Sequence, residues 1–283
     1  MRVHHLNCGT MRPLGGRLVD GRPGLRRRGE MVCHCLLLET SEGLVLVETG
    51  VGTPASTRPN EWLGMRFRLV SNPVGDMAES AVEQVVRLGF APDDVRHIVL
   101  THLDLDHAGG LVNFPDATVH VYEGELRAMR SPRNSVERLR YRQVQFAHGP
   151  RFRSYPVGGE PWFGFDAVRE LAGLGPEILL VPLAGHTRGH AGVAVDTGDG
   201  WLLNAGDSYF FHGELDAVPH CPPGLAMFES LMQAERRARL DNQRRLRELV
   251  AEHGREVTVF SAHDPVEFRG LASLPSKVSG SGA

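Results

Sequence analysis

The sequence predicts an α/β fold in which layered β-sheets are covered by outer helices. Short apolar, β-rich runs alternate along the chain with segments whose apolar residues recur at helical spacing. Two of these β-rich runs are separated only by a turn, which is typical of antiparallel hairpins. No linker rich in Pro or Gly divides the 283 residues, so we expect one domain over residues 1–283 with a flexible tail at about 276–283.

The first predicted elements are a hairpin and a long loop. Residues 33–50, CHCLLLETSEGLVLVETG, are two apolar runs joined by the turn signal TSEG. Residues 52–76 are rich in Gly, Pro and Asn and are predicted to form a loop. This loop carries Trp62, Met65 and Phe67, whose large apolar side chains must either fold back on the core or line a pocket.

Strands and helices are interleaved in the rest of the chain. The spacing of AESAVEQVVRLGF predicts a helix that stops at Gly89, and VRHIVLTH follows as a short buried strand. Further strands are predicted at ATVHVY, EILLVPL, AGVAVDTGDG, WLLNAGD and EVTVFSAHD. Helices are predicted at about 123–147, which is rich in arginine, and at about 229–253, whose mixed charges are typical of a solvated face.

The composition argues against several classes of partner. The formal net charge of −3 gives no general attraction to nucleic acid or to anionic membranes. The N-terminal MRVHHLNCGT lacks the apolar run of a signal peptide, and no window approaches the roughly 18 apolar residues of a membrane span. We expect a cytoplasmic protein with a small-molecule substrate and with no nucleic-acid or membrane partner. The sequence leaves open whether the protein forms a homodimer.

The four cysteines are expected to be reduced thiols, because nothing in the sequence indicates an oxidising compartment. Cys33 and Cys35 flank His34 in a predicted strand. Successive residues of a strand point to opposite faces, so a Cys-His-Cys metal clip would send its ligands to both sides of the sheet. Buried thiols in a core strand are the better interpretation.

Histidine and aspartate residues follow several of the predicted strands, where each strand gives way to a loop. They are His102, Asp104, Asp106 and His107 after one strand, and His186, Asp207 and His263 after three others. Side chains that emerge from several strand ends can converge on one cleft. The set therefore predicts a shared metal-binding or catalytic site.

The segment 101–110, THLDLDHAGG, concentrates most of these side chains. In an extended chain His102, Asp104 and Asp106 share one face, while the alternating leucines turn to the core. The following Ala-Gly-Gly predicts a bend that lets His107 join them. One ion does not easily accept four side chains from so short a loop, whereas two ions about 3.5–4 Å apart do.

The ordered motifs THLDLDHAGG, GHTRGH, NAGD and SAHD, after a hairpin ending in VETG, resemble the metallo-β-lactamase superfamily of metallo-hydrolases over about residues 30–265. The resemblance implies a four-layer αββα sandwich, the metallo-β-lactamase fold, with a dinuclear site at one edge of the sheets. It implies that His102, Asp104 and His186 hold the first metal, that Asp106, His107 and His263 hold the second, and that Asp207 bridges them.

Two positions depart from the usual pattern of that family. Asp104 stands where a histidine is usual, and Glu48 stands where an aspartate is usual. The extra carboxylate at Asp104 is expected to weaken the Lewis acidity of the metal and to favour harder ions. We therefore expect two divalent metal ions, with Zn²⁺ first and Mn²⁺ or Fe²⁺ as alternatives.

The resemblance is closest to the lactonase-like branches and implies a metal-bridging hydroxide that attacks an ester-type bond, as in an N-acyl homoserine lactonase. Asp106 is expected to assist the leaving group, and Tyr209 to donate a hydrogen bond to the developing oxyanion, although packing alone explains Tyr209 equally well. His190 and Asp264 are expected to orient the ligands. The acyl chain would lie against Trp62, Met65 and Phe67.

Three alternatives remain at this stage. A thioester hydrolase that resembles glyoxalase II would use the same chemistry. A carboxylate at Asp104 also resembles flavodiiron oxidoreductases, which predicts a diiron oxygen or redox protein, but 283 residues leave no room for a flavin domain after the first domain. A metal-binding scaffold without turnover is the third.

Overall fold

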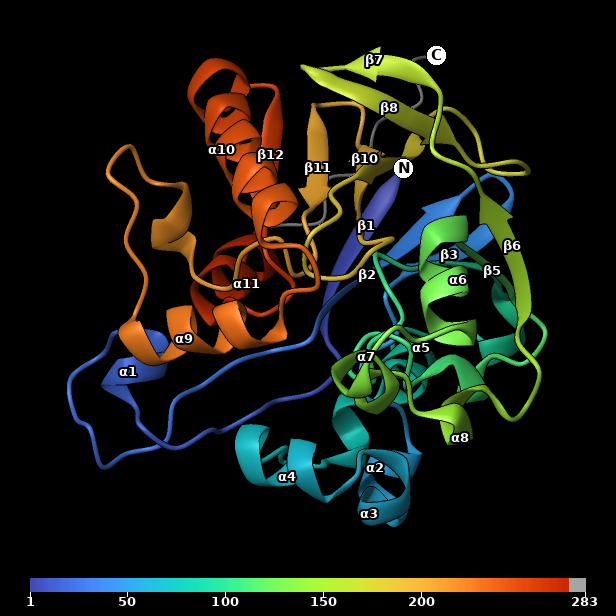
Figure 1. Ribbon diagram of the computed structural model, residues 1–283. Coiled ribbons are helices and arrows are strands. Elements are labelled where there is room, and N and C mark those ends of the chain that lie inside the picture. Colours follow the sequence, from blue (N-terminus) through green and yellow to red (C-terminus); the bar gives the residue numbers. More distant parts are fainter. Residues whose placement is uncertain (275–283) are drawn as a thin grey trace.

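The computed structural model describes residues 1–274, apart from the side chains of residues 167–169. Two sheets lie face to face, with helices on the outer sides (Figure 1). The strand order is β1-β2-β3-β4-β5-β6 in the first sheet and β12-β11-β10-β9-β8-β7 in the second. The tail predicted at about 276–283 lies outside the described residues.

Each sheet combines parallel and antiparallel pairs. In the first, β1, β2 and β3 are antiparallel, and β3 to β6 run parallel. In the second, all pairs are antiparallel except β11 with β12. The strands of the first sheet are β1 (Arg2–Asn7), β2 (His34–Thr40), β3 (Gly43–Val47), β4 (Val95–Val99), β5 (Thr118–Tyr122) and β6 (Arg151–Tyr155), and those of the second are β7 (Glu160–Trp162), β8 (Phe165–Glu170), β9 (Ile178–Pro182), β10 (Ala191–Asp196), β11 (Trp201–Asn204) and β12 (Val257–Phe260).

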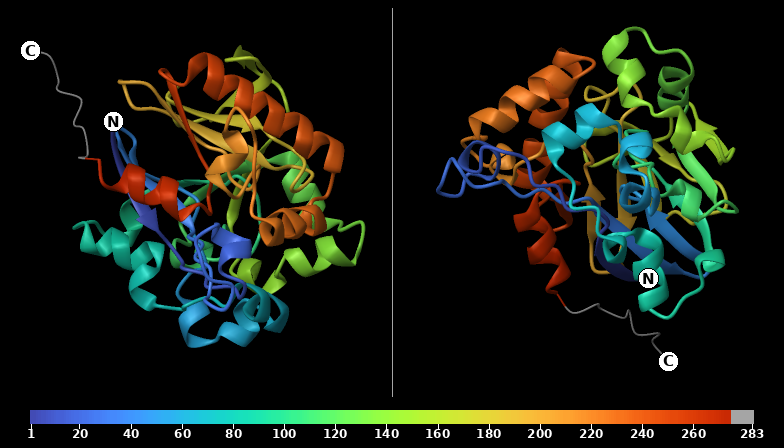
Figure 2. Two further views of the ribbon diagram at one scale, coloured as in Figure 1. Left: turned by 90° about the vertical axis from the view of Figure 1, so that its left-hand side faces the viewer. Right: turned by 90° about the horizontal axis from the view of Figure 1, so that it is seen from below.

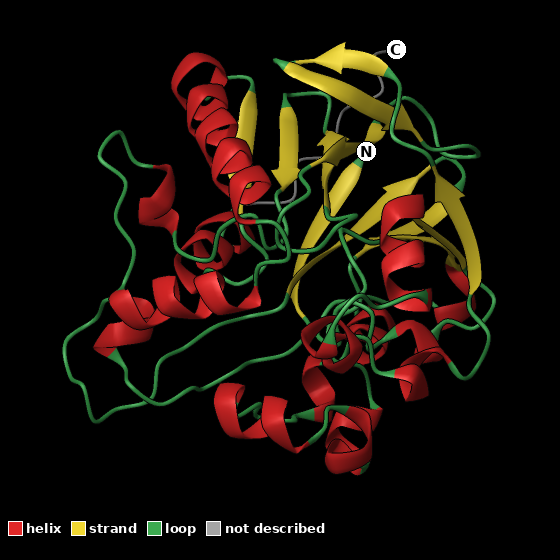
Figure 3. Cartoon of the chain, viewed as in Figure 1, coloured by secondary structure: helices red, strands yellow, loops and turns green. Residues whose placement is uncertain are grey.

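Helices surround the two sheets (Figures 2 and 3). They are α1 (Arg17–Asp20), α2 (Pro54–Thr57), α3 (Pro59–Trp62), α4 (Met65–Ser71), α5 (Ala81–Arg87), α6 (Glu123–Arg130), α7 (Ser135–Arg140), α8 (Gln143–Phe146), α9 (Pro223–Met232), α10 (Arg236–His253) and α11 (Pro265–Ala272). Helices α5 and α6 pack on the outer face of the first sheet, and α10 packs on that of the second. This is the αββα sandwich that the family resemblance implies.

Strand β2 illustrates how both faces of a sheet are buried. Leu36 and Leu38 belong to the cluster between the sheets, together with Val193 and Phe260 of the second sheet. Leu37 points the other way, into the cluster under α5 and α6. Because side chains alternate across a strand, a continuous apolar run fits a strand that is covered on both sides.

The predicted hairpin at residues 33–50 is confirmed by the antiparallel pairing of β2 with β3. The loop prediction for 52–76 is wrong in part, because α2, α3 and α4 lie within it. Proline stands in the first turn of α2 and of α3, where its missing N–H breaks no helical hydrogen bond. Short helices of this kind leave little periodicity in the sequence.

Two predicted long helices are divided. The segment at about 123–147 forms α6, α7 and α8, and the side chain of Asn134 caps α7 by accepting a hydrogen bond from the Glu137 N–H at 2.9 Å. The segment at about 229–253 is broken at Gln233, whose backbone is extended, and α9 begins earlier than expected, at Pro223. Strands β1 and β6 were not predicted, because their alternating charged or imidazole side chains hide the apolar pattern.

The ends of the strands set up the site. Strands β3 and β4 run parallel with Val47 opposite Val99, so that they stop at the same level. Strands β11 and β12 do the same in the second sheet, with Asn204 opposite Phe260. Among the described residues no helix has the length and apolar character needed to cross a membrane.

Candidate metal centre

Four loops that follow strands bring the predicted side chains together between the two sheets. The loops follow β4, β9, β11 and β12. Their histidines and aspartates are His102, Asp104, Asp106, His107, His186, Asp207 and His263, which are all buried except for the partly exposed Asp106. The prediction that separate strand ends converge is therefore met for the whole set.

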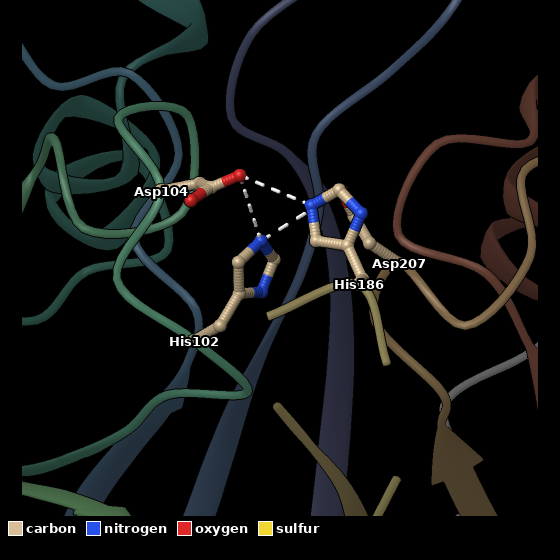
Figure 4. Close-up of side chains that lie close together, drawn as sticks. All are labelled: His102, Asp104, His186 and Asp207. Carbon is tan, nitrogen blue, oxygen red and sulfur yellow. Dashed lines mark hydrogen bonds and ion pairs between the residues drawn. The ribbon is translucent and has the colours of Figure 1, made fainter. Parts of the chain in front are cut away.

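The first group of donor atoms comprises His102, Asp104, His186 and Asp207, which lie within 4.8 Å of one another and point inward (Figure 4). The Nε2 atom of His186 lies 3.1 Å from Oδ2 of Asp104 and 3.3 Å from Oδ2 of Asp207. The Nε2 atom of His102 lies 3.4 Å from the same Asp104 oxygen. Two imidazoles and two carboxylates around one point are a donor set for a divalent cation.

The second group is formed by His107, His263 and Asp207. Oδ1 of Asp207 lies 3.2 Å from Nε2 of His107 and 3.1 Å from Nε2 of His263. Oδ2 of Asp106 is 3.7 Å from Nε2 of His263. Asp207 thus presents one oxygen to each group, which is the arrangement of a carboxylate that bridges two ions.

The protein's own contacts leave several of these buried donor atoms unsatisfied. Nε2 of His102 and Oδ1 of Asp104 have no hydrogen-bond partner, and Oδ1 of Asp207 has only the two imidazole nitrogens of the second group beside it. A buried polar atom without a partner costs about 1–3 kcal/mol. Cations between these side chains would satisfy all three atoms, so the residues present fit metal ions.

Comparison with known proteins decides the family. The sequence profile of the Metallo-beta-lactamase superfamily matches residues 28–251. The chain belongs to this superfamily. It is 43% identical over 265 residues to a protein of Mycobacterium tuberculosis named "Probable metallo-hydrolase", covering 94% of this chain and 81% of that protein. The chain is therefore a metal-dependent hydrolase of this superfamily. Membership of the superfamily does not distinguish between a lactone and a thioester as the substrate.

The more distant relatives of this chain include lactonases. An N-acyl homoserine lactonase of a Bacillus species is 28% identical over 248 residues, with 86% of each chain covered. The solved structure of a Bacillus thuringiensis AiiA variant with N-decanoyl-L-homoserine at its active site matches with a TM-score of 0.71 at 20% identity, over 95% of each chain. This last match shows the shared fold.

Charge–charge contacts keep two of the carboxylates ionised. Burial alone would raise the pKa of Asp207, but the facing imidazoles of His263 and His107 hold it well below its usual range. Burial is likewise outweighed at Asp104, where the Arg140 guanidinium and His102 hold the pKa well below normal. These carboxylates are therefore anionic donors at neutral pH.

The second ring nitrogen of each histidine in the second group is held by a partner, which aims Nε2 at the centre. Nδ1 of His107 donates to Oε2 of Glu48 at 2.6 Å, and Nδ1 of His263 donates to the Val32 carbonyl at 2.7 Å. The other oxygen of Glu48 accepts the Thr101 N–H at 2.5 Å. Glu48, the second departure from the family pattern, thus ties the hairpin to the ligand loop.

The two residues expected to orient ligands lie in different places. His190 accepts the Asp207 N–H on Nε2 at 2.9 Å and donates from Nδ1 to the Leu183 carbonyl at 3.0 Å, so both ring nitrogens are engaged. Asp264 caps α11 and accepts the His212 N–H at 2.7 Å. Within residues 1–274 its carboxylate bonds to His212 and to the first turn of α11 and not to a ligand side chain, and its part in orienting His263 stays a prediction.

The hydroxyl of Tyr209 is already engaged. Tyr209 is fully buried, and its O–H donates to Oε1 of Glu267 at 2.9 Å. Its expected role as a donor to the oxyanion stays a prediction and requires this hydrogen bond to break. The sequence offered no sign of Glu267 as its partner.

The three apolar residues expected to line a substrate pocket are spread between core and surface. Trp62 is fully buried and donates from Nε1 to the Val51 carbonyl at 2.9 Å, so it is part of the core. Phe67 packs partly buried against the same cluster, whereas Met65 is 69% exposed. Their contact with a substrate stays a prediction.

Sequence reasoning missed Glu125, a buried residue of α6 that joins two ligand loops. Its Oε1 accepts the Leu103 N–H at 3.0 Å. Its Oε2 accepts the Thr187 hydroxyl at 2.6 Å and the Gly189 N–H at 3.2 Å. The acidic residue stands in an ordinary helical segment, and no local sequence signal distinguishes it.

Cys33 and Arg140 were also missed. The thiol of Cys33 lies within 4.8 Å of donor atoms of Asp106 and His263, so it borders the second group in addition to being buried as expected. Arg140, at the end of α7, reaches Asp104 and His186. The signal for Arg140 was Asp104 itself, because a buried carboxylate in place of an imidazole calls for a nearby cation.

Proposed function

We propose that the protein is a dinuclear metal hydrolase that opens lactone rings, with N-acyl homoserine lactones as the substrate class. The observation that carries the proposal is the geometry of Asp207, whose two oxygens face the two groups of donor atoms. The relatives named as N-acyl homoserine lactonases, which align over 86% of both chains, support the substrate class.

In this proposal, His102, Asp104 and His186 would hold one ion, Asp106, His107 and His263 would hold the other, and Asp207 would serve both. Two divalent ions, Zn²⁺ in the first instance, supply Lewis acidity that activates water and polarises a carbonyl. Proton transfer and substrate binding are carried out by the side chains around the ions.

Asp106 is placed to hold a proton for the leaving group. Its side chain is 12% exposed, against 10% for Asp104 and 5% for Asp207, so it is the most accessible of the three carboxylates. Without bound metal, burial raises the pKa of Asp106, whereas the pKa values of Asp104 and Asp207 lie well below normal. When a lactone ring opens, the departing alkoxide oxygen takes this proton and becomes the hydroxyl of the product.

We place the acyl chain at a narrow hollow beside the second group, where side chains would have to move apart to admit it. Its lining is mixed: apolar side chains, among them Met31, Phe210, Phe211 and Leu225, stand beside His263 and the carboxylates of Asp20, Glu30 and Asp264. Phe210 stacks on the His263 ring with a centroid distance of 5.2 Å. His263 is itself part of the lining, and the apolar side chains of the hollow would contact a chain attached to the reacting ring.

The test is a substrate panel on the metal-loaded protein: N-acyl homoserine lactones of increasing chain length, simple lactones, thioesters and phosphodiesters. We expect lactone hydrolysis that is lost in Asp207→Asn and retained in Asp93→Asn, an exposed control. Thioester or phosphodiester turnover without lactone turnover would contradict the substrate class. Iron-dependent oxygen consumption in place of hydrolysis would contradict the reaction.

The hollow has its own matched pair of variants. Leu225 and Leu231 both lie on α9, but Leu225 is buried at the hollow and Leu231 is 67% exposed. Leu225→Ala is expected to shift the kcat/KM ratio toward longer acyl chains by about tenfold, because one pocket methylene is worth about 1–3 kcal/mol in discrimination. Leu231→Ala is expected to leave the ratio unchanged, and an equal shift in both variants would place the acyl chain elsewhere.

A further inference from the structure

Arg140 reaches from the end of α7 into the first group of donor atoms. Its Nη1 donates to Oδ2 of Asp104 and lies 2.6 Å from Nε2 of His186. Its Nη2 donates to the carbonyl of Met232 at the end of α9. The Arg140 side chain is 2% exposed, so this is a buried guanidinium held at three points.

The contact with His186 has a definite direction. A guanidinium has only N–H donors and keeps its charge at any ordinary pH. Nε2 of His186 must therefore be the acceptor, and it uses its one lone pair for Arg140. That lone pair is also the one that a metal ion at the first group would take, and it cannot serve both partners.

The rest of the first group stays available. Nε2 of His102 and Oδ1 of Asp104 have no hydrogen-bond partner. Arg140 therefore occupies one oxygen of Asp104 and the imidazole of His186, and leaves the other donors open. Two of the donor atoms of the first group, one on Asp104 and one on His186, are therefore engaged by Arg140.

The second group differs in this respect. In the hydrogen bonds and ion pairs of residues 1–274, the imidazole rings of His107 and His263 contact carboxylates, a backbone carbonyl and each other, and neither ring contacts an arginine. A cation entering the second group would displace no arginine, although it would separate the two imidazoles, whose Nε2 atoms lie 3.2 Å apart. The two groups are therefore unequal although they share Asp207.

We propose that Arg140 competes with the metal ion of the first group, so that the two ions bind with unequal affinity and the second group fills first. Asp104 is what keeps Arg140 in place, since its carboxylate supplies the counter-charge. If an ion were bound at the first group, His186 would have to release the guanidinium, which could keep its contacts with Asp104 and the Met232 carbonyl.

The pairing also changes the charge balance of the centre. The carboxylate of Asp104 adds a negative charge relative to a histidine at the same position, and Arg140 adds a positive charge beside it. The two charges offset each other. Asp104 alone would lower the Lewis acidity of the metal ion at the first group. Paired with Arg140, it instead sets the affinity of the first group for that ion.

The test is a binding titration of Zn²⁺ into metal-free protein, with the stoichiometry checked by elemental analysis. Wild type is expected to bind one ion tightly and a second at least about tenfold more weakly, within the range by which groups adjacent to ligands alter metal affinity. Arg140→Gln is expected to tighten only the weaker site by about tenfold or more. Arg138→Gln, an exposed change on the same helix, is expected to behave as wild type.

A further pair of variants assigns the effect to the first group. In a His186→Ala background the first group is incomplete, so adding Arg140→Gln is expected to change nothing. Superimposable titrations of wild type and Arg140→Gln would overturn the proposal, as would an equal tightening of both sites.

If Arg140→Gln does not fold, as judged by circular dichroism and thermal melting, then Arg140→Lys decides. A single ammonium cannot hold the Met232 carbonyl and Asp104 in the same way, so the weaker site is expected to tighten by a smaller factor. An unchanged titration of Arg140→Lys would then overturn the proposal. The inference rests on the metal centre of the proposed function and not on the lactone, since a failed substrate panel leaves these titrations unaffected.

Discussion

At the scale of single residues, the site is defined by how each buried charge is compensated. Asp207 is surrounded by imidazoles, and Asp104 is paired with Arg140. A buried ion pair is not in itself strongly stabilising, but removal of one partner leaves the other charge buried and uncompensated. The consequence of altering Asp104 is therefore decided mainly by what happens to Arg140.

This leads to a stability prediction for the metal-free protein. Asp104→Asn is expected to lower the free energy of unfolding by about 3–5 kcal/mol, because Arg140 loses its counter-charge in a buried place. Asp116→Asn removes a carboxylate from the exposed pair with Arg151 and is expected to cost at most about 1 kcal/mol. Urea unfolding in the presence of a chelator measures both, and equal costs would contradict the argument.

The double variant completes a thermodynamic cycle. Adding Arg140→Gln to Asp104→Asn removes the buried charge that Asp104→Asn leaves behind, so part of the stability is expected to return. The coupling free energy between the two positions is the quantity to be measured. A sum of the two single effects, without coupling, would show that the ion pair contributes nothing.

A second residue-scale prediction concerns acid sensitivity away from the metal centre. His120 is fully buried, and its ring nitrogens contact His97 at 2.9 Å and the Tyr155 hydroxyl at 2.7 Å. Burial, with smaller contributions from His97 and Arg153, lowers the pKa of His120 to about 3. Between about pH 3 and 6.5 the unfolded chain therefore binds more protons than the folded protein, and stability falls as the pH is lowered through this range.

The expected slope from His120 is about 1.4 kcal/mol per pH unit. His120→Gln should therefore lose about 2 kcal/mol less than wild type when the pH is lowered from 7 to 5, as measured by urea unfolding. His220→Gln changes an exposed histidine and serves as the control, with the pH dependence of wild type. Equal pH dependence in wild type and His120→Gln would show that His120 is not a buried neutral group.

At the scale of secondary-structure elements, the ligand loops are shaped by close backbone contacts. A Cβ atom added at Gly110 would lie 2.4 Å from the Thr49 carbonyl oxygen, and one at Gly109 would lie 2.5 Å from the Val51 carbonyl oxygen. Backbone cannot move aside as a flexible side chain can. The two glycines at the end of THLDLDHAGG thus hold the ligand loop against the turn that follows β3.

Gly110→Ala is therefore expected to displace the loop that carries His102 to His107. We expect a loss of stability of about 1–3 kcal/mol, typical of overpacking, together with weaker metal binding. Gly270→Ala lies in α11, where nothing is within 4 Å of the added atom, and a change of less than about 1 kcal/mol is expected. Thermal melting and metal titration measure both variants, and normal metal binding by Gly110→Ala would contradict the role given to this contact.

The elements also show why only part of the molecule could be predicted from the sequence. The hairpin and the strands before His102 and His263 are apolar runs bounded by turns, and local pattern suffices to find them. The position of α7 does not follow from local pattern, because a short helix is fixed by its cap and its tertiary contacts. The partners of Asp104 and of Tyr209 could not be predicted for the same reason.

At the scale of the whole molecule, the donor atoms come from both sheets. His102 to His107 follow β4 of the first sheet, and His186, Asp207 and His263 follow strands of the second. Glu125 adds a hydrogen-bonded link between loops of the two sheets. Ions held between these side chains would favour the folded arrangement over the unfolded chain, because only the folded chain assembles the donors.

Metal removal is therefore expected to lower the stability of the whole protein. At a free ion concentration about one hundred times the dissociation constant, one bound ion adds about 2.7 kcal/mol. Thermal melting with and without a chelator measures the change. Asp207→Asn, which affects both groups, is expected to melt at nearly the same temperature in both conditions, and a wild type unaffected by the chelator would contradict a structural contribution of the ions.

The spread of the donors along the chain also bears on how the protein is made. His102 to His107 are synthesised well before His263, which follows β12, the strand that pairs with β11. Until then Asp207 faces the second group without one of its two imidazoles. A metal ion that needs both imidazoles of the second group would therefore bind there only once His263 has joined His107.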